Sequence, residues 1–152
     1  MKRNWMAFCL AAALMTAGTV YAKPAPSQLV PEKHGQCYVE DNLFVKDVNG
    51  AGGGQGVLHG DFAFRREQAL KTDAIKEIGW MTLKPGSYIG SHTHKDNEDA
   101  YLIISGKGIF TDGNGHAWVV GAGDMTIARP GQTHGLANLG KEDLVSLISL
   151  LK

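Results

Sequence analysis

Short apolar stretches separated by turn residues dominate the chain from residue 75 onward. Within these stretches apolar and polar residues alternate, which is typical of strands with one buried face. Turn signals separate them, including Lys84-Pro85-Gly86 and the hairpin sequence DGNG at 112–115. The tail, 144–151, has a spacing that also suits a helix, but the short strands before it favour a closing strand. The other predicted strands are 75–83, 87–94, 98–105, 108–112, 116–120, 125–128 and 133–138.

The chain before residue 75 has a weaker pattern. Short strands are predicted at 37–40 and 43–48, and 65–74 is predicted to form one short helix or a polar excursion. The stretch GAGGGQG at 50–56 lacks the spacing of a dinucleotide-binding or phosphate-binding loop, so we interpret it as a mobile connector. Several short strands spaced by roughly 8–12 residues predict an all-β fold, a small antiparallel β-barrel or sandwich. One domain over 37–152 is the simplest organisation.

The first 22 residues differ in composition from the rest. Lys2 and Arg3 precede an apolar run, WMAFCLAAALM, and small residues end at Ala22. This layout predicts a secretory signal peptide over 1–22 and an exported protein, periplasmic or secreted. A membrane anchor is the alternative, but the run is shorter than the roughly 20 apolar residues that a span needs. Residues 23–36, with three prolines, are predicted to be a flexible leader.

Charge and cysteine content exclude some classes of partner and bond. Without Lys2 and Arg3, the chain has 13 basic and 15 acidic residues, so neither nucleic acid nor an anionic membrane surface is an expected partner. Cys37 is the only cysteine after the predicted signal peptide, so no disulfide within the chain is expected. We expect Cys37 to be buried as a small hydrophobic residue, the alternative being a bond between two chains.

The stretch GSHTHKDNEDAYLIISGKG at 90–108 carries candidate metal chemistry. His92 and His94 project from one face of a predicted strand, because alternate strand residues point the same way. Two imidazoles in an apolar interior each need polar partners, and charging both is costly. A shared metal ion satisfies both, since each ring gives it one nitrogen lone pair. The alternative is that these residues form a solvated polar face.

Further candidate ligands follow in the sequence. Glu98 and Asp99 come after a turn that would bring the next strand alongside, and only one of two adjacent strand residues can point inward. His134 follows the tight turn Pro130-Gly131, from which a strand could return to the same cavity. Three histidines and one carboxylate suit a divalent ion such as Mn, Fe, Ni, Zn or Cu, with open positions for water, substrate or dioxygen.

Two motifs in this region resemble those of the cupins, a family of small β-barrel proteins. The first motif is glycine, five residues, His-x-His, three or four residues, glutamate, six residues and glycine. Its positions are matched by Gly86, His92, His94 and Gly106. Counting back from Gly106 puts Asp99 at the glutamate position. Glu98 fits the shorter spacer, but Ser105 then departs from the closing glycine.

The second motif is glycine, five residues, proline, x, glycine, two residues, histidine, three residues and asparagine. Its positions are matched by Gly123, Gly131, His134 and Asn138. Arg129 stands where the motif has proline. The resemblance covers roughly 75–150, and the pairing of both motifs makes it specific.

The resemblance to the cupins implies a fold and a ligand set. The fold is a jelly-roll-like double-stranded β-helix, and the metal is held by the counterparts of His92, His94, His134 and the acidic residue. We favour Asp99 over Glu98 as that residue, although aspartate is one methylene shorter than glutamate.

Other residues have weaker assignments. Tyr101 shares a strand face with Asp99, so it is a candidate catalytic proton shuttle or a packed core residue. Arg129 is a candidate for recognising a substrate carboxylate, the alternative being an ordinary ion pair at the rim. Trp80 either lines the cavity or covers the outside of the barrel. His34, His59 and His116 are expected to lie in loops or at strand ends, in solvated positions.

Two hypotheses about function remain open at this point. The first is a small exported metalloenzyme acting on an oxygenated or carboxylate compound, with the metal as Lewis acid. The second is a binding or sensing module without turnover, because cupins include plain ligand binders and a fold does not select a reaction. In either case the partner is a small molecule. A homodimer formed through 37–48 is also predicted, because this segment has few obvious partners within the motif-bearing barrel.

Overall fold

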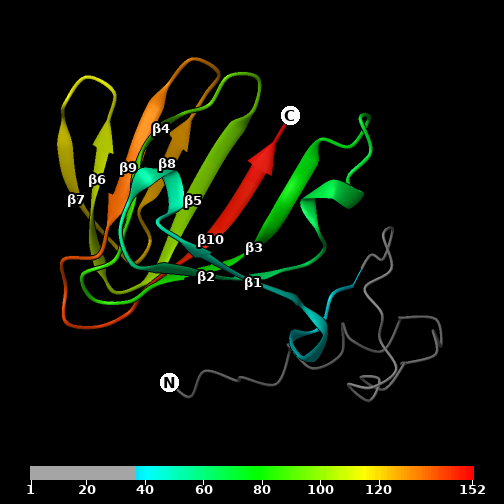
Figure 1. Ribbon diagram of the computed structural model, residues 1–152, viewed down its shortest axis with the longest axis horizontal. Coiled ribbons are helices and arrows are strands. Elements are labelled where there is room, and N and C mark those ends of the chain that lie inside the picture. The colour runs from blue at the N-terminus through cyan, green and yellow to red at the C-terminus, as the bar shows by residue number, and fades with distance from the viewer. Residues whose placement is uncertain (1–36) are drawn as a thin grey trace, which may run out of the picture.

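A computed structural model describes residues 37–152, and the predicted signal peptide and leader lie outside the described residues. This part of the chain is all-β and forms two antiparallel sheets (Figure 1). The strands are β1 (Phe44–Asn49), β2 (Val57–Phe62), β3 (Ile75–Leu83), β4 (Tyr88–Thr93), β5 (Glu98–Ser105), β6 (Lys107–Asp112), β7 (Ala117–Gly121), β8 (Met125–Ala128), β9 (Thr133–Ala137) and β10 (Leu144–Leu151). The described residues also form three short 3₁₀ helices: η2 (Glu40–Asn42) before β1, η3 (Ala51–Gly53) between β1 and β2, and η4 (Arg66–Gln68) between β2 and β3.

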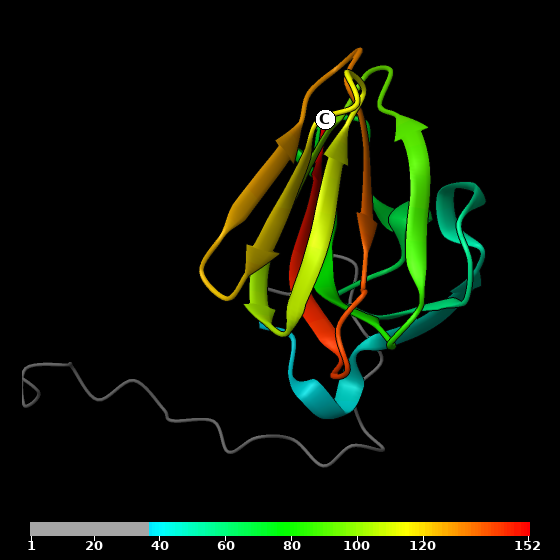
Figure 2. The same ribbon diagram turned by 90° about the vertical axis from the view of Figure 1, so that its left-hand side faces the viewer.

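The two sheets face each other and enclose the core. One has the strand order β1-β2-β3-β10-β5-β8 and the other β4-β9-β6-β7, so the chain crosses repeatedly from one sheet to the other (Figures 1 and 2). This is the architecture of a jelly roll, as predicted. Apolar side chains from both sheets, such as Met81, Ile103 and Leu136, are buried between them.

Most strands after residue 75 lie where the sequence pattern predicts them. β3, β5, β8 and β10 coincide with the predicted ranges. The tail is a strand and not a helix because β10 pairs with both β3 and β5. Its residues alternate between buried and half-buried along the whole length, so a period of two fits this position in the sheet.

The predictions for the N-terminal part are less accurate. Residues 37–40 do not form a strand, because η2 begins at Glu40 and the residues before it are irregular. β2 was not predicted, because one of its inward positions is a glycine. Leu58, Gly60 and Phe62 occupy alternate positions, and a Cβ on Gly60 would lie 2.2 Å from the Phe62 ring. The apolar signal of that face is therefore interrupted in the sequence.

The glycine-rich stretch at 50–56 is a packed segment and not the mobile connector that we predicted. Gln55 pairs with Tyr88 through two backbone hydrogen bonds, of 2.9 and 3.1 Å. Gly54 lies so close to β4 that a Cβ there would be 2.0 Å from the Tyr88 carbonyl oxygen. The glycines therefore permit close approach of this loop to the strand that carries His92.

Several motif residues have clear structural roles. The motif glycines Gly86, Gly106, Gly123 and Gly131 all have positive φ, which other residues rarely adopt. Asn138 is fully buried, and its amide donates to the carbonyl oxygens of Leu83 and Glu142 at 2.7 and 2.8 Å. It thereby satisfies the backbone at the start of β10.

Two further expectations about the N-terminal part are corrected. Cys37 is exposed and not buried, because it precedes the first strand and the short helix η2 that follows it has no buried residue. The segment 37–48 does have a partner within the chain, since β1 pairs along its length with β2. β1 is nevertheless the edge of its sheet, and the homodimer stays a prediction. Within residues 37–152, no helix has the length and apolar character needed to cross a membrane.

Candidate metal centre

Strand alternation on β5 separates the two candidate carboxylates. Asp99, Tyr101 and Ile103 are buried and face the space between the sheets. Glu98 lies on the other side of the strand, half-buried, with its carboxylate 3.8 Å from the Arg129 guanidinium. The structure therefore places Asp99 inside and Glu98 at the rim. The aspartate side chain reaches the interior although it is one methylene shorter than that of glutamate.

A β-bulge in β4 aligns the two histidines of the His-x-His motif with the interior. Ile89 pairs with Leu136 and His92 pairs with His134, so β4 has one more residue than β9 between these pairs. Without the extra residue, Ile89 and His92 would face opposite sides of the sheet. The bulge brings Ile89 and His92 to the same interior, with His92 directly across from His134.

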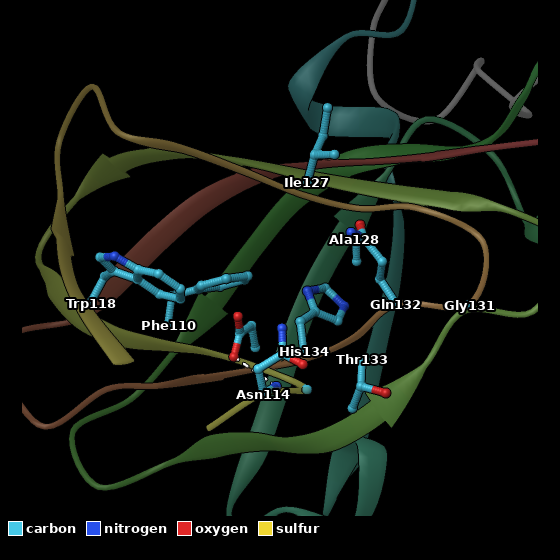
Figure 3. A pocket seen from close by; sticks show the side chains of 11 residues that line it. Phe110, Asn114, Trp118, Ile127, Ala128, Gly131, Gln132, Thr133 and His134 are labelled. Carbon is cyan, nitrogen blue, oxygen red and sulfur yellow. Dashed lines mark hydrogen bonds between the residues drawn. The ribbon is translucent and has the colours of Figure 1, made fainter. Parts of the chain in front are cut away.

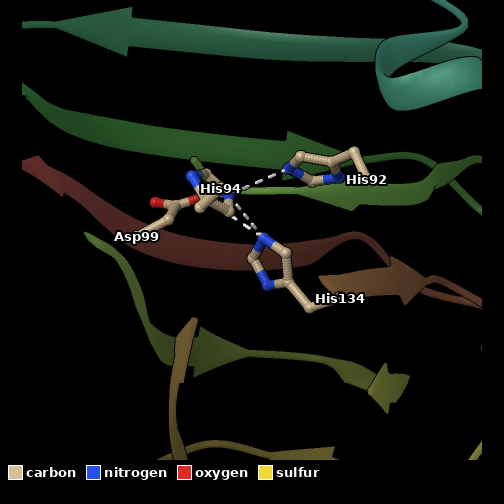
Figure 4. Close-up of side chains that lie close together, drawn as sticks. All are labelled: His92, His94, Asp99 and His134. Atoms are coloured by element: carbon tan, nitrogen blue, oxygen red, sulfur yellow. Dashed lines mark hydrogen bonds and ion pairs between the residues drawn. The ribbon is translucent and has the colours of Figure 1, made fainter. Parts of the chain in front are cut away.

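Three imidazole nitrogens and one carboxylate converge at this point (Figure 4). Nε2 of His94 lies 3.2 Å from Nε2 of His92 and 3.0 Å from Nε2 of His134. Oδ2 of Asp99 is 3.6 Å from Nε2 of both His94 and His134. The four ligand atoms all lie within 4.8 Å of one another. We call His92, His94, Asp99 and His134 the His/Asp cluster.

Hydrogen bonds fix which ring nitrogens face the centre. Nδ1 of His92 is 3.0 Å from the carbonyl oxygen of Gly90, which can only accept, so the proton is on Nδ1. Nδ1 of His94 lies 3.1 Å from Oδ1 of Asn97 and is held in the same way. Nε2 of both rings therefore carries a lone pair that points into the cluster.

Burial opposes charge on the members of the cluster. It raises the pKa of Asp99 from 3.8 to about 6, and the neighbouring Tyr101 hydroxyl and His92 offset part of this rise. Burial, together with the charges of His92 and His94, lowers the pKa of His134 from 6.5 to about 3. His134 is thus neutral near pH 7, which is the form that donates a lone pair to a metal.

The His/Asp cluster passes a test of fit to a metal ion. Facing nitrogen lone pairs repel each other unless a cation lies between them. At metal–nitrogen distances of about 2.1 Å, neighbouring ligand nitrogens lie about 3.0–3.4 Å apart, which is the spacing found here. Oδ1 of Asp99 is also buried without a hydrogen-bond partner among the described residues, so this carboxylate lacks a partner that a cation would supply. The donor set and its spacing therefore fit a divalent ion.

Cavities lie on two sides of the cluster. One, of about 300 Å³, lies between β4 and the N-terminal strands and is lined by His92, His94, Asp99 and Tyr101. A second, of about 410 Å³, lies on the other side of His134, beside Phe110 and Trp118 (Figure 3). We call the first the barrel cavity. It reaches three members of the cluster, so it is the better candidate to hold a ligand.

Known proteins resemble this chain in sequence and in fold. Residues 79–150 match the family model described as the Cupin domain. A curated relative, the oxalate-binding protein of Thermotoga maritima, is 37% identical over 71 residues, which are 47% of this chain and 58% of the relative. The chain therefore matches little more than half of that relative's length.

Solved structures agree with this assignment. The crystal structure of a predicted oxalate decarboxylase from Thermotoga maritima has a TM-score of 0.68 at 26% identity, covering 76% of this chain and 98% of that one. The protein belongs to the cupin superfamily. Another solved structure, that of an uncharacterised conserved protein with a double-stranded β-helix domain from Klebsiella pneumoniae, has a TM-score of 0.54 at 29% identity, covering 71% of this chain and 83% of that one.

The remaining predicted site residues of this cupin lie away from the cluster or at its edge. Tyr101 is buried beside it, with its ring stacked on His134 at 5.2 Å between centroids. Burial and the Asp99 carboxylate raise the pKa of Tyr101 well above its usual value, so the phenol stays protonated. Arg129 is exposed and pairs with Glu98, which is the rim ion pair given above as its alternative role. Trp80 is 43% exposed and covers the outside of the barrel.

The other histidines do not join the cluster. His59 lies within β2, where its Nδ1 is 2.6 Å from Asp47, and it is not in a loop or at a strand end as predicted. His116 is exposed beside Asp112, at 3.0 Å. His34 lies outside the described residues.

Sequence reasoning missed the residues that this cupin contributes from its N-terminal part. Gly52 lies against His92, where a Cβ would be 3.1 Å from Nδ1. Lys46, Arg66 and Glu77 line the barrel cavity together with the cluster. No motif marks them. The sequence contains one signal of this wall, the acidic residue Glu77. It occupies an inward position of β3, a strand that is otherwise apolar on that face.

Proposed function

We propose that this cupin binds a divalent metal ion through His92, His94, Asp99 and His134, and binds a small carboxylate such as oxalate at that ion. The convergence of three Nε2 atoms and one carboxylate oxygen within 4.8 Å carries the proposal. A bound ion supplies Lewis acidity and a site for an anionic oxygen ligand. The name of the oxalate-binding relative from Thermotoga maritima supports the choice of carboxylate.

The residues of the barrel cavity favour binding over turnover. The phenol of Tyr101 has a pKa well above 10 and holds its proton, so it can donate a hydrogen bond but cannot act as a base near pH 7. The Glu77 carboxylate is occupied by an ion pair with Arg66. The cavity thus offers hydrogen-bond donors and cations, and among the described residues it has no free general base beside the cluster. Binding without catalysis is therefore the primary proposal.

A metalloenzyme that transforms its carboxylate ligand is the second candidate. The observation in its favour is the likeness to the predicted oxalate decarboxylase, which reaches 98% of that chain. In that case Tyr101 is the candidate proton donor, because its hydroxyl lies in the cavity beside Asp99.

Elemental analysis and calorimetry test the proposal together. The purified protein is analysed for transition metals before and after reloading with Mn²⁺, Fe²⁺, Ni²⁺, Zn²⁺ or Cu²⁺, and oxalate is then titrated into the loaded protein. We expect about one ion per chain and metal-dependent oxalate binding. A His92→Ala/His94→Ala variant should lose both.

The matched control is His59→Ala/His116→Ala, which removes two histidines outside the cluster and should keep both metal and oxalate. A parent protein that stays empty after reloading would overturn the proposal. Release of formate or CO₂ from oxalate in the same samples would favour the enzyme over the binding module.

We further propose that the protein is exported, with cleavage after Ala22. The charged start and apolar run of the first 22 residues support this. N-terminal sequencing of the protein from the producing cell should begin at Lys23. A chain that begins at Met1 in the cytoplasm would contradict export.

A further inference from the structure

Two cationic side chains line the barrel cavity together with members of the His/Asp cluster. Lys46 from β1 and Arg66 from η4 line the same cavity as His92, His94 and Asp99. Lys46 is half-buried and forms no ion pair with a carboxylate among the described residues. A cavity that holds two cations and a metal site suits an anionic ligand.

Arg66 is held in place by a buried carboxylate. Its Nη2 donates to Oε2 of Glu77, whose residue is only 3% exposed, while the Arg66 side chain is half-exposed. A guanidinium has five N–H donors, and this bond uses one of them. The remaining donors have no acceptor among the described residues, so they are available to a ligand. Glu77 is therefore a positioning residue for Arg66.

The guanidinium of Arg66 shares one cavity with the cluster. Arg66 lines the barrel cavity, of about 300 Å³, together with His92, His94 and Asp99. A ligand held at the cluster and extending through this cavity would meet the free donors of Arg66.

Positive charge continues outside the cavity. Arg66 also lines a surface pocket of about 430 Å³, together with Lys71, Lys76, Lys152 and Asp96. The ammonium of Lys76 donates to the Leu70 carbonyl at 2.5 Å and that of Lys152 to the Lys71 carbonyl at 2.8 Å. None of the three lysines pairs with a carboxylate among residues 37–152, so the region around Arg66 attracts anions.

We propose that Arg66 selects dicarboxylates over monocarboxylates by binding the far carboxylate of a ligand whose near carboxylate occupies the His/Asp cluster. The inference rests on the proposed function, and it adds a residue and a ligand class to it. A monocarboxylate has a single carboxylate group, which binds at the cluster alone. A dicarboxylate brings a second charge into the cavity, which is costly to bury unless a cation pairs with it. The planar fork of an arginine matches that carboxylate.

Calorimetric titration of oxalate and of acetate tests this on the metal-loaded protein. Zn²⁺ is used for loading if the purified protein carries no metal of its own. For Arg66→Gln we expect oxalate affinity to fall roughly tenfold to a hundredfold, as for a lost charge-assisted pair, with acetate affinity unchanged. Arg66→Lys keeps the charge without the fork and should give an intermediate loss.

Two further variants keep the test decisive. Arg66→Gln leaves the buried Glu77 without its cation, so the same titrations are made on Arg66→Gln/Glu77→Gln, which removes both charges. Arg65→Gln is the matched control, because its guanidinium lies over the Phe44 ring at 4.5 Å and does not line the cavity. It should bind oxalate like the parent. Metal content and thermal unfolding are measured for every variant.

The outcomes separate this inference from the proposed function. Equal oxalate affinity in the parent and in Arg66→Gln/Glu77→Gln overturns the role of Arg66 and leaves metal-dependent carboxylate binding intact. An equal loss for oxalate and acetate also overturns it, because Arg66 then acts on the cluster and not on the second carboxylate. A loaded parent that binds neither anion overturns the proposed function, and the inference with it.

Discussion

The two walls of the barrel cavity offer a ligand different chemistry. The wall formed by β4, β5 and β9 presents three imidazoles, two of them buried, and one buried carboxylate, held by strand register and a β-bulge. The wall formed by β1 and the β2–β3 connection presents cations that are half-exposed, Lys46 and Arg66. The first wall suits a metal, and the second suits the part of an anion that projects away from it. Ligand choice in this cupin can therefore change without any change in the metal ligands.

The largest effect is expected from the first wall, where the choice of carboxylate can be tested directly. Asp99→Asn should weaken metal binding by at least about a hundredfold, because even the loss of a residue behind a ligand costs 10–100-fold. Glu98→Gln is the matched control and should leave metal affinity unchanged, since Glu98 is on the outer side of β5. Metal affinity is measured by competition with a chelator. A loss in Glu98→Gln alone would reverse the assignment.

Substitutions in the glycine-rich stretch at 50–56 test the contact between the two walls of the barrel cavity. In Gly54→Ala the new Cβ would meet the Tyr88 carbonyl oxygen at 2.0 Å, so the loop must leave β4 or β4 must shift. We expect a loss of about 2–3 kcal/mol in the free energy of unfolding. Urea denaturation measures it.

Gly53→Ala is the control for this prediction. Gly53 has no atom within 4 Å of a new Cβ, but its φ of +78° strains an alanine, so about 1 kcal/mol is expected. Equal losses in both variants would show that the close approach to β4 does not require a glycine at position 54.

A smaller effect on metal affinity is expected from a change of pH, which acts on Asp99 in the first wall. The pKa of Asp99 in the metal-free protein is about 6, so above pH 6 the carboxylate binds a metal without releasing a proton. Below pH 6 the metal must displace that proton. Protonation of Asp99 should therefore lower metal affinity by roughly tenfold for each pH unit. Titrations at several pH values, in the parent and in Asp99→Asn, measure the difference in slope. Identical slopes would remove Asp99 from the ligand set.

The smallest effect is expected from Lys46 on the second wall. Lys46→Gln should lower oxalate affinity only about two- to fivefold, because its half-exposed ammonium is screened by solvent. The loss should shrink further at high salt. Lys84→Gln is the control, since Lys84 pairs with Asp143 and does not line the cavity. A loss as large as that of Arg66→Gln would mean that charge alone, without the arginine fork, selects the anion.

The sequence by itself determined the part of this protein that depends on local rules. Alternation of period two defined the strands after residue 75, and the two motif spacings predicted that His92, His94, His134 and one of two adjacent carboxylates lie together. Only the tertiary structure decided between Asp99 and Glu98, because the inward side of β5 is set by pairing with β10 and β8.

The N-terminal wall also required the tertiary structure. β2 has a glycine at an inward position, and Arg66 is one cation among several in a polar stretch, so neither carries a local signal. Their role comes from β1 and β2, which extend the six-stranded sheet beside β3 and so bring together residues far apart in the chain. Long-range pairing of this kind is fixed by burial and backbone hydrogen bonding over the whole sheet, and no short window of sequence contains it.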